Sequence, residues 1–248
     1  MYLRTIQASA LRTIFEVLKD IINDVNLYFT PEGLKIVTLD TARVTLVHMF
    51  LMAENFEEYT CSSEIIAGLN IANTYKLLKS VTNNDSLAIT IEDRDIMEIK
   101  IENTVKNSST SFRLKLLDIN EDILDVPDIK MDLVTTLPSV DFQRVARDMA
   151  NLSQDLSITR HNTQLVLSCQ GEFADQTTTI DCGTDGPDEP IGNVFSLKYI
   201  NMFTKATNLC SSVQIFQDAN DSNMPIIIRY AIANLGDVRF YLAPKVND

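Results

Sequence analysis

Two stretches in the first half of the chain space their apolar residues as an amphipathic helix does. Residues 10–25 carry one apolar stripe, formed by Leu11, Ile14, Leu18, Ile21 and Val25. A predicted helix over residues 71–80 carries a second stripe, formed by Ile71, Thr74, Leu77 and Leu78 and continued by Val81 just after it. Because an α-helix repeats about every 3.6 residues, each set falls on one side, and we expect that side to be buried.

Runs rich in β-branched and aromatic residues predict strands between and after these helices. The runs cover residues 34–39, 44–49, 86–92, 96–102 and 111–117. Residues 118–132 differ in character, because they are acidic, contain one proline and follow no clear period. We interpret this segment as an extended connector.

The second half of the chain repeats the order of elements. Helices are predicted from Ser139, which is a plausible N-cap after Pro138, and over residues 196–206. Strands are predicted over residues 156–159, 164–169, 176–181, 213–217, 225–231 and 238–242. We therefore expect an α+β protein with two similar domains, residues 1–117 and 135–248, joined by a connector at 118–134.

Charge adds a second pattern to these helices. The chain has 34 acidic and 21 basic residues, a net charge of −13, yet each of four predicted helices carries two basic residues away from its apolar stripe. The pairs are Arg12 and Lys19, Lys76 and Lys79, Arg144 and Arg147, and Lys198 and Lys205. Any one pair is typical of a solvated helix face. Four pairs in an acidic chain favour a sequence-independent track for a phosphate backbone.

Motifs for catalysis are missing from the sequence. It contains no GxxxxGK[ST], GxGxxG or GxSxG motif, and its two histidines, His48 and His161, lie in opposite halves. The four cysteines lack the close spacing of zinc sites, and no apolar run is long enough to cross a bilayer. We expect no catalytic residue, no metal, no cofactor and no membrane partner.

Six short motifs point to a known family. They are LKDIIN at 18–23, LDTARVTLV at 39–47, KLLK at 76–79, LPS at 137–139 with Phe142 and RVARD at 144–148, FTKAT at 203–207, and YLAPK at 241–245. In this order, and over nearly the whole chain, they resemble the proliferating cell nuclear antigen family, the DNA sliding clamps of eukaryotes, archaea and viruses.

The resemblance implies a fold and a mechanism. Members have two like domains, each of two βαβββ units, and three subunits close head to tail into a ring whose helices line a central hole. Such a ring encircles double-stranded DNA without sequence preference and serves as a processivity factor for DNA polymerase in replication and repair. The expected partners are DNA, a polymerase, a clamp loader, proteins with short clamp-binding peptide motifs, and further copies in a homotrimer. The expected location is the nucleus, or the host replication compartment for a viral member.

The resemblance also implies three sets of site residues by matching position. DNA-facing residues are Arg12, Lys19, Lys76, Lys79, Arg144, Arg147 and Lys205, with Lys115 on a strand. The pocket for partner motifs is lined by Leu39, Arg43, Val44, Leu46, Leu124, Val126, Pro127, Pro225, Tyr241, Ala243 and Pro244. The subunit contact pairs a strand with Thr110, Phe112, Leu114 and Leu116 against one with Phe173, Asp175, Thr177 and Thr179.

The sequence departs from the family pattern at two places, and it leaves alternatives for the assembly and the function. Arg43 stands where cellular members commonly carry histidine, and residues 160–163 lack a lysine that members often carry there. The chain could form a homotrimer or supply one subunit of a heterotrimer, and the sequence does not distinguish the two. A monomeric or dimeric processivity factor that does not encircle DNA is a second hypothesis, and an enzyme using acidic clusters is a third.

Overall fold

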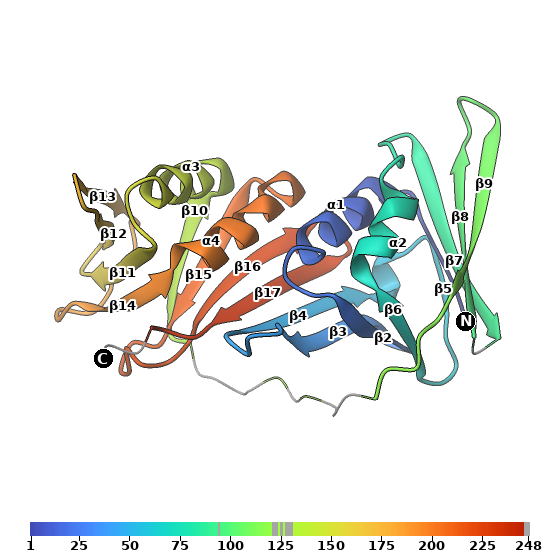
Figure 1. Ribbon diagram of the computed structural model, residues 1–248, viewed down its shortest axis with the longest axis horizontal. Coiled ribbons are helices and arrows are strands. Elements are labelled where there is room, and N and C mark those ends of the chain that lie inside the picture. Colours follow the sequence, from blue (N-terminus) through green and yellow to red (C-terminus); the bar gives the residue numbers. More distant parts are fainter. Residues whose placement is uncertain (94, 121–123, 125, 127–130, 246–248) are drawn as a thin grey trace. The chain divides into compact units, whose positions relative to one another are not determined.

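The computed structural model describes the chain except for residues 94, 121–123, 125, 127–130 and 246–248. It divides into two compact units (Figure 1). Unit 1 comprises Met1–Thr41, Val47–Val126 and Ala231–Val238, and unit 2 comprises Ala42–Leu46, Pro127–Tyr230 and Arg239–Asp248.

The first half of the chain contains two β-α-β-β-β runs. The first run is β1 (Tyr2–Thr5), α1 (Ala8–Leu18), β2 (Asp24–Thr30), β3 (Gly33–Leu39) and β4 (Thr45–Met52). A short 3-10 helix (Ala53–Asn55) and β5 (Glu58–Thr60) follow. The second run is β6 (Ile65–Asn70), α2 (Ile71–Leu78), β7 (Asp85–Asp93), β8 (Ile96–Asn103) and β9 (Ser108–Lys115).

The second half repeats both runs. The third run is β10 (Leu133–Pro138), α3 (Ser139–Ala150), β11 (Asp155–His161), β12 (Gln164–Gln170) and β13 (Asp175–Asp181). The fourth is β14 (Ile191–Ser196), α4 (Leu197–Phe203), a 3-10 helix (Thr204–Leu209), β15 (Ser212–Gln217), β16 (Ile226–Ile232) and β17 (Gly236–Leu242). This fourfold βαβββ plan confirms the predicted fold class.

In each unit, one sheet ends in a strand that carries predicted subunit-contact residues. In unit 1, an antiparallel sheet has the order β5-β1-β7-β8-β9, so β9 ends it. In unit 2, an antiparallel sheet has the order β13-β12-β11-β14, so β13 ends it. Elsewhere β2 pairs with β3 and β6, and β15 pairs with β10 and β16.

Each unit buries the apolar sides of one helix pair. In Figure 1, α1 lies beside α2 in unit 1, and α3 lies beside α4 in unit 2. The helix α3 buries Phe142, Val145 and Met149 at helical spacing, which is the predicted stripe. In unit 2, Phe203 of α4 also stacks on Phe240 of β17, with ring centroids 4.5 Å apart.

The predicted first helix is too long. In the structure, α1 ends at Leu18, and the Leu18 carbonyl oxygen accepts hydrogen bonds from the N–H groups of both Ile21 and Ile22. Val25, which the prediction placed in the helix, belongs to β2. Ile21 and Val25 fit the helical period by coincidence. From residue 24 onward the chain is rich in β-branched and aromatic residues, and it pairs with β6.

Two further details of the helices differ from the prediction. Ser139 is the first residue of α3 and is buried, whereas Pro138 is the N-cap; the Ser139 N–H donates to the Ser211 carbonyl oxygen. The predicted helix over 196–206 is α4 followed by a 3-10 helix. The sequence pattern does not predict the strands β1, β2, β5, β6, β10 and β14, because each is short or mixes polar residues into its apolar pattern.

Candidate nucleic-acid interface and partner surfaces

The basic residues of α1 are partly held by neighbouring groups. The Arg12 guanidinium is half-buried, and its Nη1 donates to the Val81 carbonyl oxygen at 2.9 Å. Lys19 follows the last residue of α1, and its Nζ lies 3.2 Å from Asp20 Oδ1 and 5.4 Å from the centroid of the Tyr75 ring. These contacts fix both cations beside the α1–α2 pair.

An acidic residue on the same helix acts on a tyrosine of α2. Burial raises the pKa of Tyr75, and a hydrogen bond with the Glu16 carboxylate raises it further. Glu16 is the one acidic residue within α1. The Glu16 carboxylate and the Arg12 guanidinium thus both act on the Tyr75 side chain of α2, and they shift its pKa in opposite directions.

The basic residues of α2 are exposed. Asn70 caps the helix by accepting from the Asn73 N–H at 2.9 Å, and this fixes the start of the helix. Lys76 Nζ donates to Asn73 Oδ1 at 2.9 Å, and Lys79 stands at the C-cap. Both lysines point away from the buried Ile71, Thr74 and Leu78 side.

The helix α3 presents two arginines to solvent. Arg144 Nη2 lies 3.4 Å from Asp141 Oδ1, and the Arg144 side chain is 65% exposed. An ion pair this exposed is worth about 0–1 kcal/mol, so it is easily exchanged for a phosphate. Arg147 lies one turn further along and is also exposed.

The last predicted pair is split between two elements. Lys198 is exposed in α4, while Lys205 is exposed in the 3-10 helix that follows. Within the bounds of the four α-helices there are five basic and three acidic residues, whereas the chain as a whole has 21 and 34. The charge balance of the helices is thus opposite to that of the chain.

Lys115 lies apart from the helical residues. It is the last residue of β9, is exposed, and alternates with the half-buried Phe112 and Leu114. Its side chain is therefore on the face of the sheet opposite to those two residues.

The predicted subunit-contact residues lie on or next to the two edge strands. Thr110 is exposed and Phe112, Leu114 and Leu116 are half-buried, on or just after β9. Asp175, Thr177 and Thr179 are exposed on β13. Phe173 is 81% exposed in the β12–β13 turn, an unusual position for a phenylalanine.

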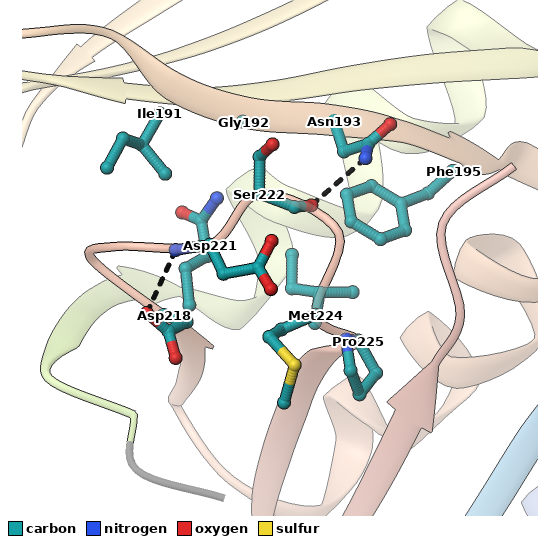
Figure 2. A pocket seen from close by; sticks show the side chains of 11 residues that line it. Ile191, Gly192, Asn193, Phe195, Asp218, Asp221, Ser222, Met224 and Pro225 are labelled. Atoms are coloured by element: carbon teal, nitrogen blue, oxygen red, sulfur yellow. Dashed lines mark hydrogen bonds between the residues drawn. The ribbon is translucent and has the colours of Figure 1, made fainter. Parts of the chain in front are cut away.

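Part of the predicted partner-motif pocket lies within unit 2. The Ala243 N–H donates to the Val44 carbonyl oxygen at 3.1 Å, which joins the C-terminal segment to the residues before β4. Tyr241 is buried, Leu46 and Pro244 are half-buried, and Arg43 is exposed with a left-handed φ of 56°. Pro225 lines a small cavity of about 10 Å³, room for one water, beside Asp221 and Met224 (Figure 2).

The other predicted pocket residues belong to unit 1. Leu39 ends β3 and is half-buried, as are Leu124 and Val126. Leu124 lines a cavity of about 110 Å³ with Tyr28 and Lys35. Pro127 lies outside the described residues.

Neither a metal centre nor a membrane span is found in the described part of the chain. Within residues 1–245, apart from the gaps given above, no three His, Cys, Asp or Glu side chains gather closely enough to hold an ion. Over the same residues, no helix has the length and apolar character that a bilayer crossing requires.

Comparison with protein families decides the relationship. Residues 1–124 match the model of the proliferating cell nuclear antigen N-terminal domain, and residues 125–245 match that of the C-terminal domain. The chain belongs to the proliferating cell nuclear antigen family.

Two relatives of this family are similar over nearly full length. A probable DNA polymerase sliding clamp 1 of Paramecium bursaria Chlorella virus 1 is 35% identical over 254 residues, which cover 98% of this chain and 96% of the relative. The proliferating cell nuclear antigen of Chaetomium thermophilum is 30% identical over 253 residues, with the same coverage.

Sequence reasoning within the proliferating cell nuclear antigen family missed two charged positions on the edge strands. Arg113 on β9 and Asp181 on β13 are both exposed. The alternation of polar and apolar residues along each strand could have revealed them, because it assigns every second residue to the exposed face.

Proposed function

We propose that this chain works as a homotrimeric ring around duplex DNA. Membership of the proliferating cell nuclear antigen family makes the chain a DNA sliding clamp and a processivity factor for replication. The observation that supports encirclement is the reversed charge of the helices, which carry more basic than acidic residues in a chain of net charge −13.

The helix residues Arg12, Lys19, Lys76, Lys79, Arg144, Arg147 and Lys205 form the DNA-facing set in this proposal. These cations attract the phosphate backbone without reading bases, so a clamp held by them slides freely. A closed ring stays on DNA by topology and needs no tight contact. Tethering a polymerase to the ring raises the effective concentration of the enzyme at the primer end.

Partners bind elsewhere in the proposal. Two domains, residues 1–117 and 135–248, are joined by a connector at 118–134. The predicted pocket residues from Leu39 to Pro244 take the apolar anchors of a short peptide motif carried by a polymerase or another replication or repair protein. A clamp loader opens the ring on DNA. The chain has no catalytic role, and it acts in the nucleus or in a host replication compartment.

The test uses a double charge reversal on α3. Arg144→Glu with Arg147→Glu leaves the buried side of the helix intact, so the fold is expected to persist. Two acidic residues facing phosphates repel DNA, so the amount of clamp loaded onto a nicked circular duplex should fall at least about tenfold. The loaded clamp is measured by gel filtration, with a polymerase extension assay alongside.

A control reversal and a topology test accompany this experiment. Lys35→Glu changes the same charge on β3, outside the proposed DNA-facing set, and should leave the loaded amount unchanged. Linearising the circle should release the wild-type ring, since it slides off free ends. A clamp that stays bound after linearisation would favour the non-encircling factor, and unchanged loading of the α3 variant would remove Arg144 and Arg147 from the DNA contact.

A further inference from the structure

The start of the predicted connector is bound to a strand of unit 1. The Leu117 N–H donates to the Gly68 carbonyl oxygen at 2.7 Å, and the two residues form an isolated antiparallel bridge. Gly68 lies on β6, which ends its sheet in the described strand order. Figure 1 shows the chain leaving β9 and passing β6 before the part drawn in grey. The first connector residues therefore take up part of a strand edge that would otherwise be unpaired.

A buried asparagine binds the connector two residues further along. Asn26 lies on β2 directly opposite Gly68, and its Nδ2 donates to the Ile119 carbonyl oxygen at 3.1 Å. Asn26 is only 5% exposed. A side-chain amide buried at this depth destabilises the fold unless it is hydrogen-bonded, so the bond to the connector is one that the strand itself requires.

The burial of Asn26 departs from the pattern of its own strand. Side chains alternate along a strand, so Leu27 and Phe29 share one face of β2, and Asn26 and Tyr28 share the other. Leu27 and Phe29 are buried and Tyr28 is half-buried, as expected for an inner and an outer face. Asn26 is buried although it lies on the outer face. The contact with Ile119 explains this, because the connector covers β2 at that position.

Gly68 allows the connector to approach this closely. A Cβ atom on residue 68 would lie 2.2 Å from the Leu117 carbonyl oxygen and 3.1 Å from the Ile119 side chain. The first distance is too short for any side chain, so only glycine fits here without a shift of the backbone. Asn26 and Gly68 thus contact the connector from two neighbouring strands. We refer to these two residues, together with Leu117 and Ile119, as the connector latch.

We propose that the connector latch positions the connector for partner peptides, with Asn26 as a positioning residue. Leu124, a predicted pocket residue, lines a cavity with Tyr28, which lies two residues from Asn26 on the same face of β2. Fixing the Ile119 backbone limits where Leu124 can go, so a peptide that binds there orders less of the chain. This inference rests on the proposed function and adds the residues that preorganise one side of its pocket.

The substitution Asn26→Ala tests the latch. It removes the donor to the Ile119 carbonyl oxygen without adding bulk, so hydrogen exchange of the Leu117 N–H should become about threefold faster or more. Affinity for a synthetic peptide that carries a clamp-binding motif should fall about three- to tenfold in calorimetry. The entropy of binding should become less favourable, because the peptide then has to order the connector.

Asn55→Ala is the matched control. Asn55 Nδ2 also donates to a backbone carbonyl oxygen, that of Leu235 at 3.3 Å, and both residues belong to unit 1 outside the connector. The control loses the same kind of hydrogen bond, so it should lose a similar amount of stability. Peptide affinity and exchange of the Leu117 N–H should stay at wild-type values. Urea unfolding followed by circular dichroism checks that each variant is folded under the conditions of the binding assay.

A second variant, Gly68→Ala, disrupts the latch from the neighbouring strand. The added Cβ has to displace the Leu117 carbonyl oxygen, so exchange at Leu117 should rise and peptide affinity should fall as in Asn26→Ala. Because both substitutions act on one contact, the loss of affinity in the double variant should be smaller than the two separate losses combined. Gly68→Ala also carries the test on its own should Asn26→Ala fail to fold.

The outcomes separate this inference from the proposed function. Wild-type peptide affinity in Asn26→Ala and Gly68→Ala, at any rate of exchange of the Leu117 N–H, overturns the positioning role and leaves the partner pocket in place. An equal loss of affinity in Asn55→Ala also overturns it, since the loss then follows general stability. A wild type that binds no motif peptide overturns the proposed pocket and this inference together.

Discussion

At the scale of single residues, the buried carboxylate of Asp85 is satisfied by three nearby donors. Asp85, at the start of β7, is buried and accepts hydrogen bonds from the Thr82 N–H, the Thr82 hydroxyl and the Asn103 side-chain amide. These three donors hold the turn after α2 against the β7–β8 pair. Burial alone raises the pKa of the Asp85 carboxyl, but the hydrogen bonds outweigh it and the pKa is lowered.

The Asp85 network predicts a stability effect. Both oxygens of the Asp85 carboxylate accept hydrogen bonds. In Asp85→Asn, an NH₂ group replaces one of these oxygens, so it either faces a donor or turns away and leaves that donor without its acceptor. We expect a loss of about 1–3 kcal/mol in the free energy of unfolding. Urea unfolding followed by circular dichroism measures the loss. Exposed Asp95→Asn is the matched control and should change stability little.

The same carboxyl predicts how stability depends on pH. The pKa of the Asp85 carboxyl is lower in the folded protein than in the unfolded chain, where it is about 3.9. The ionised carboxylate therefore stabilises the folded protein at pH values above the unfolded pKa. That contribution is lost as the pH falls through the folded pKa. Stability of the wild type should therefore fall in acid more steeply than stability of Asp85→Asn. Parallel curves for the two proteins below about pH 4 would show that the carboxyl is not stabilised by folding.

At the scale of elements, the C-terminal segment is attached to unit 2 by contacts that lie outside β17. Besides the Ala243 bond to Val44, the Lys245 N–H donates to the Val194 carbonyl oxygen at 2.8 Å, and Lys245 Nζ lies 2.6 Å from Asp155 Oδ1. The side chains of Tyr241 and Leu242 are buried in β17 itself. The segment after Leu242 can thus be removed without opening the core of this unit.

Truncation after Leu242 tests the role of this segment. The protein loses two backbone hydrogen bonds and one exposed ion pair, so stability should fall by only about 1–3 kcal/mol. It also loses Ala243 and Pro244, and binding of a clamp-binding motif peptide should drop below detection in calorimetry. A chain ending at Lys245 is the control and should bind normally. Full binding by the shorter chain would take both residues out of the partner pocket.

At the scale of the whole molecule, the distribution of charge is more informative than its sum. A net charge of −13 repels DNA in general, whereas basic residues gathered on helices attract it locally. The same segregation produces one basic and one acidic sheet edge. Both features depend on where the cations are placed, and neither follows from composition.

The proposed ring makes a direct prediction for solution mass. Light scattering at micromolar concentration and moderate salt should give about three times the chain mass of 27.9 kDa. Binding across three interfaces is cooperative, because a closed ring must break two contacts to release one subunit. A mass equal to a single chain under these conditions would contradict the homotrimer.

Much of the fold could be predicted from local pattern. The apolar stripe of α3 and the strands β7, β8 and β12 were predicted within a few residues, since their side chains alternate or repeat with the period of the element. The end of α1 could not be predicted, because Ile21 and Val25 continue its period into the next strand. Strands as short as β1 and β5 carry too few residues to show a period at all.

The sequence by itself determined the family, the four helices, most of the strands between them, and the placement of basic residues on or next to the helices. These follow from periodicity and from motifs that are local in the chain. Only the tertiary structure decided that Arg12 is held by the Val81 carbonyl oxygen, that Glu16 raises the pKa of Tyr75, and that β9 and β13 are sheet edges with opposite charge. Such facts depend on strand order and on contacts between distant residues, which no local pattern encodes.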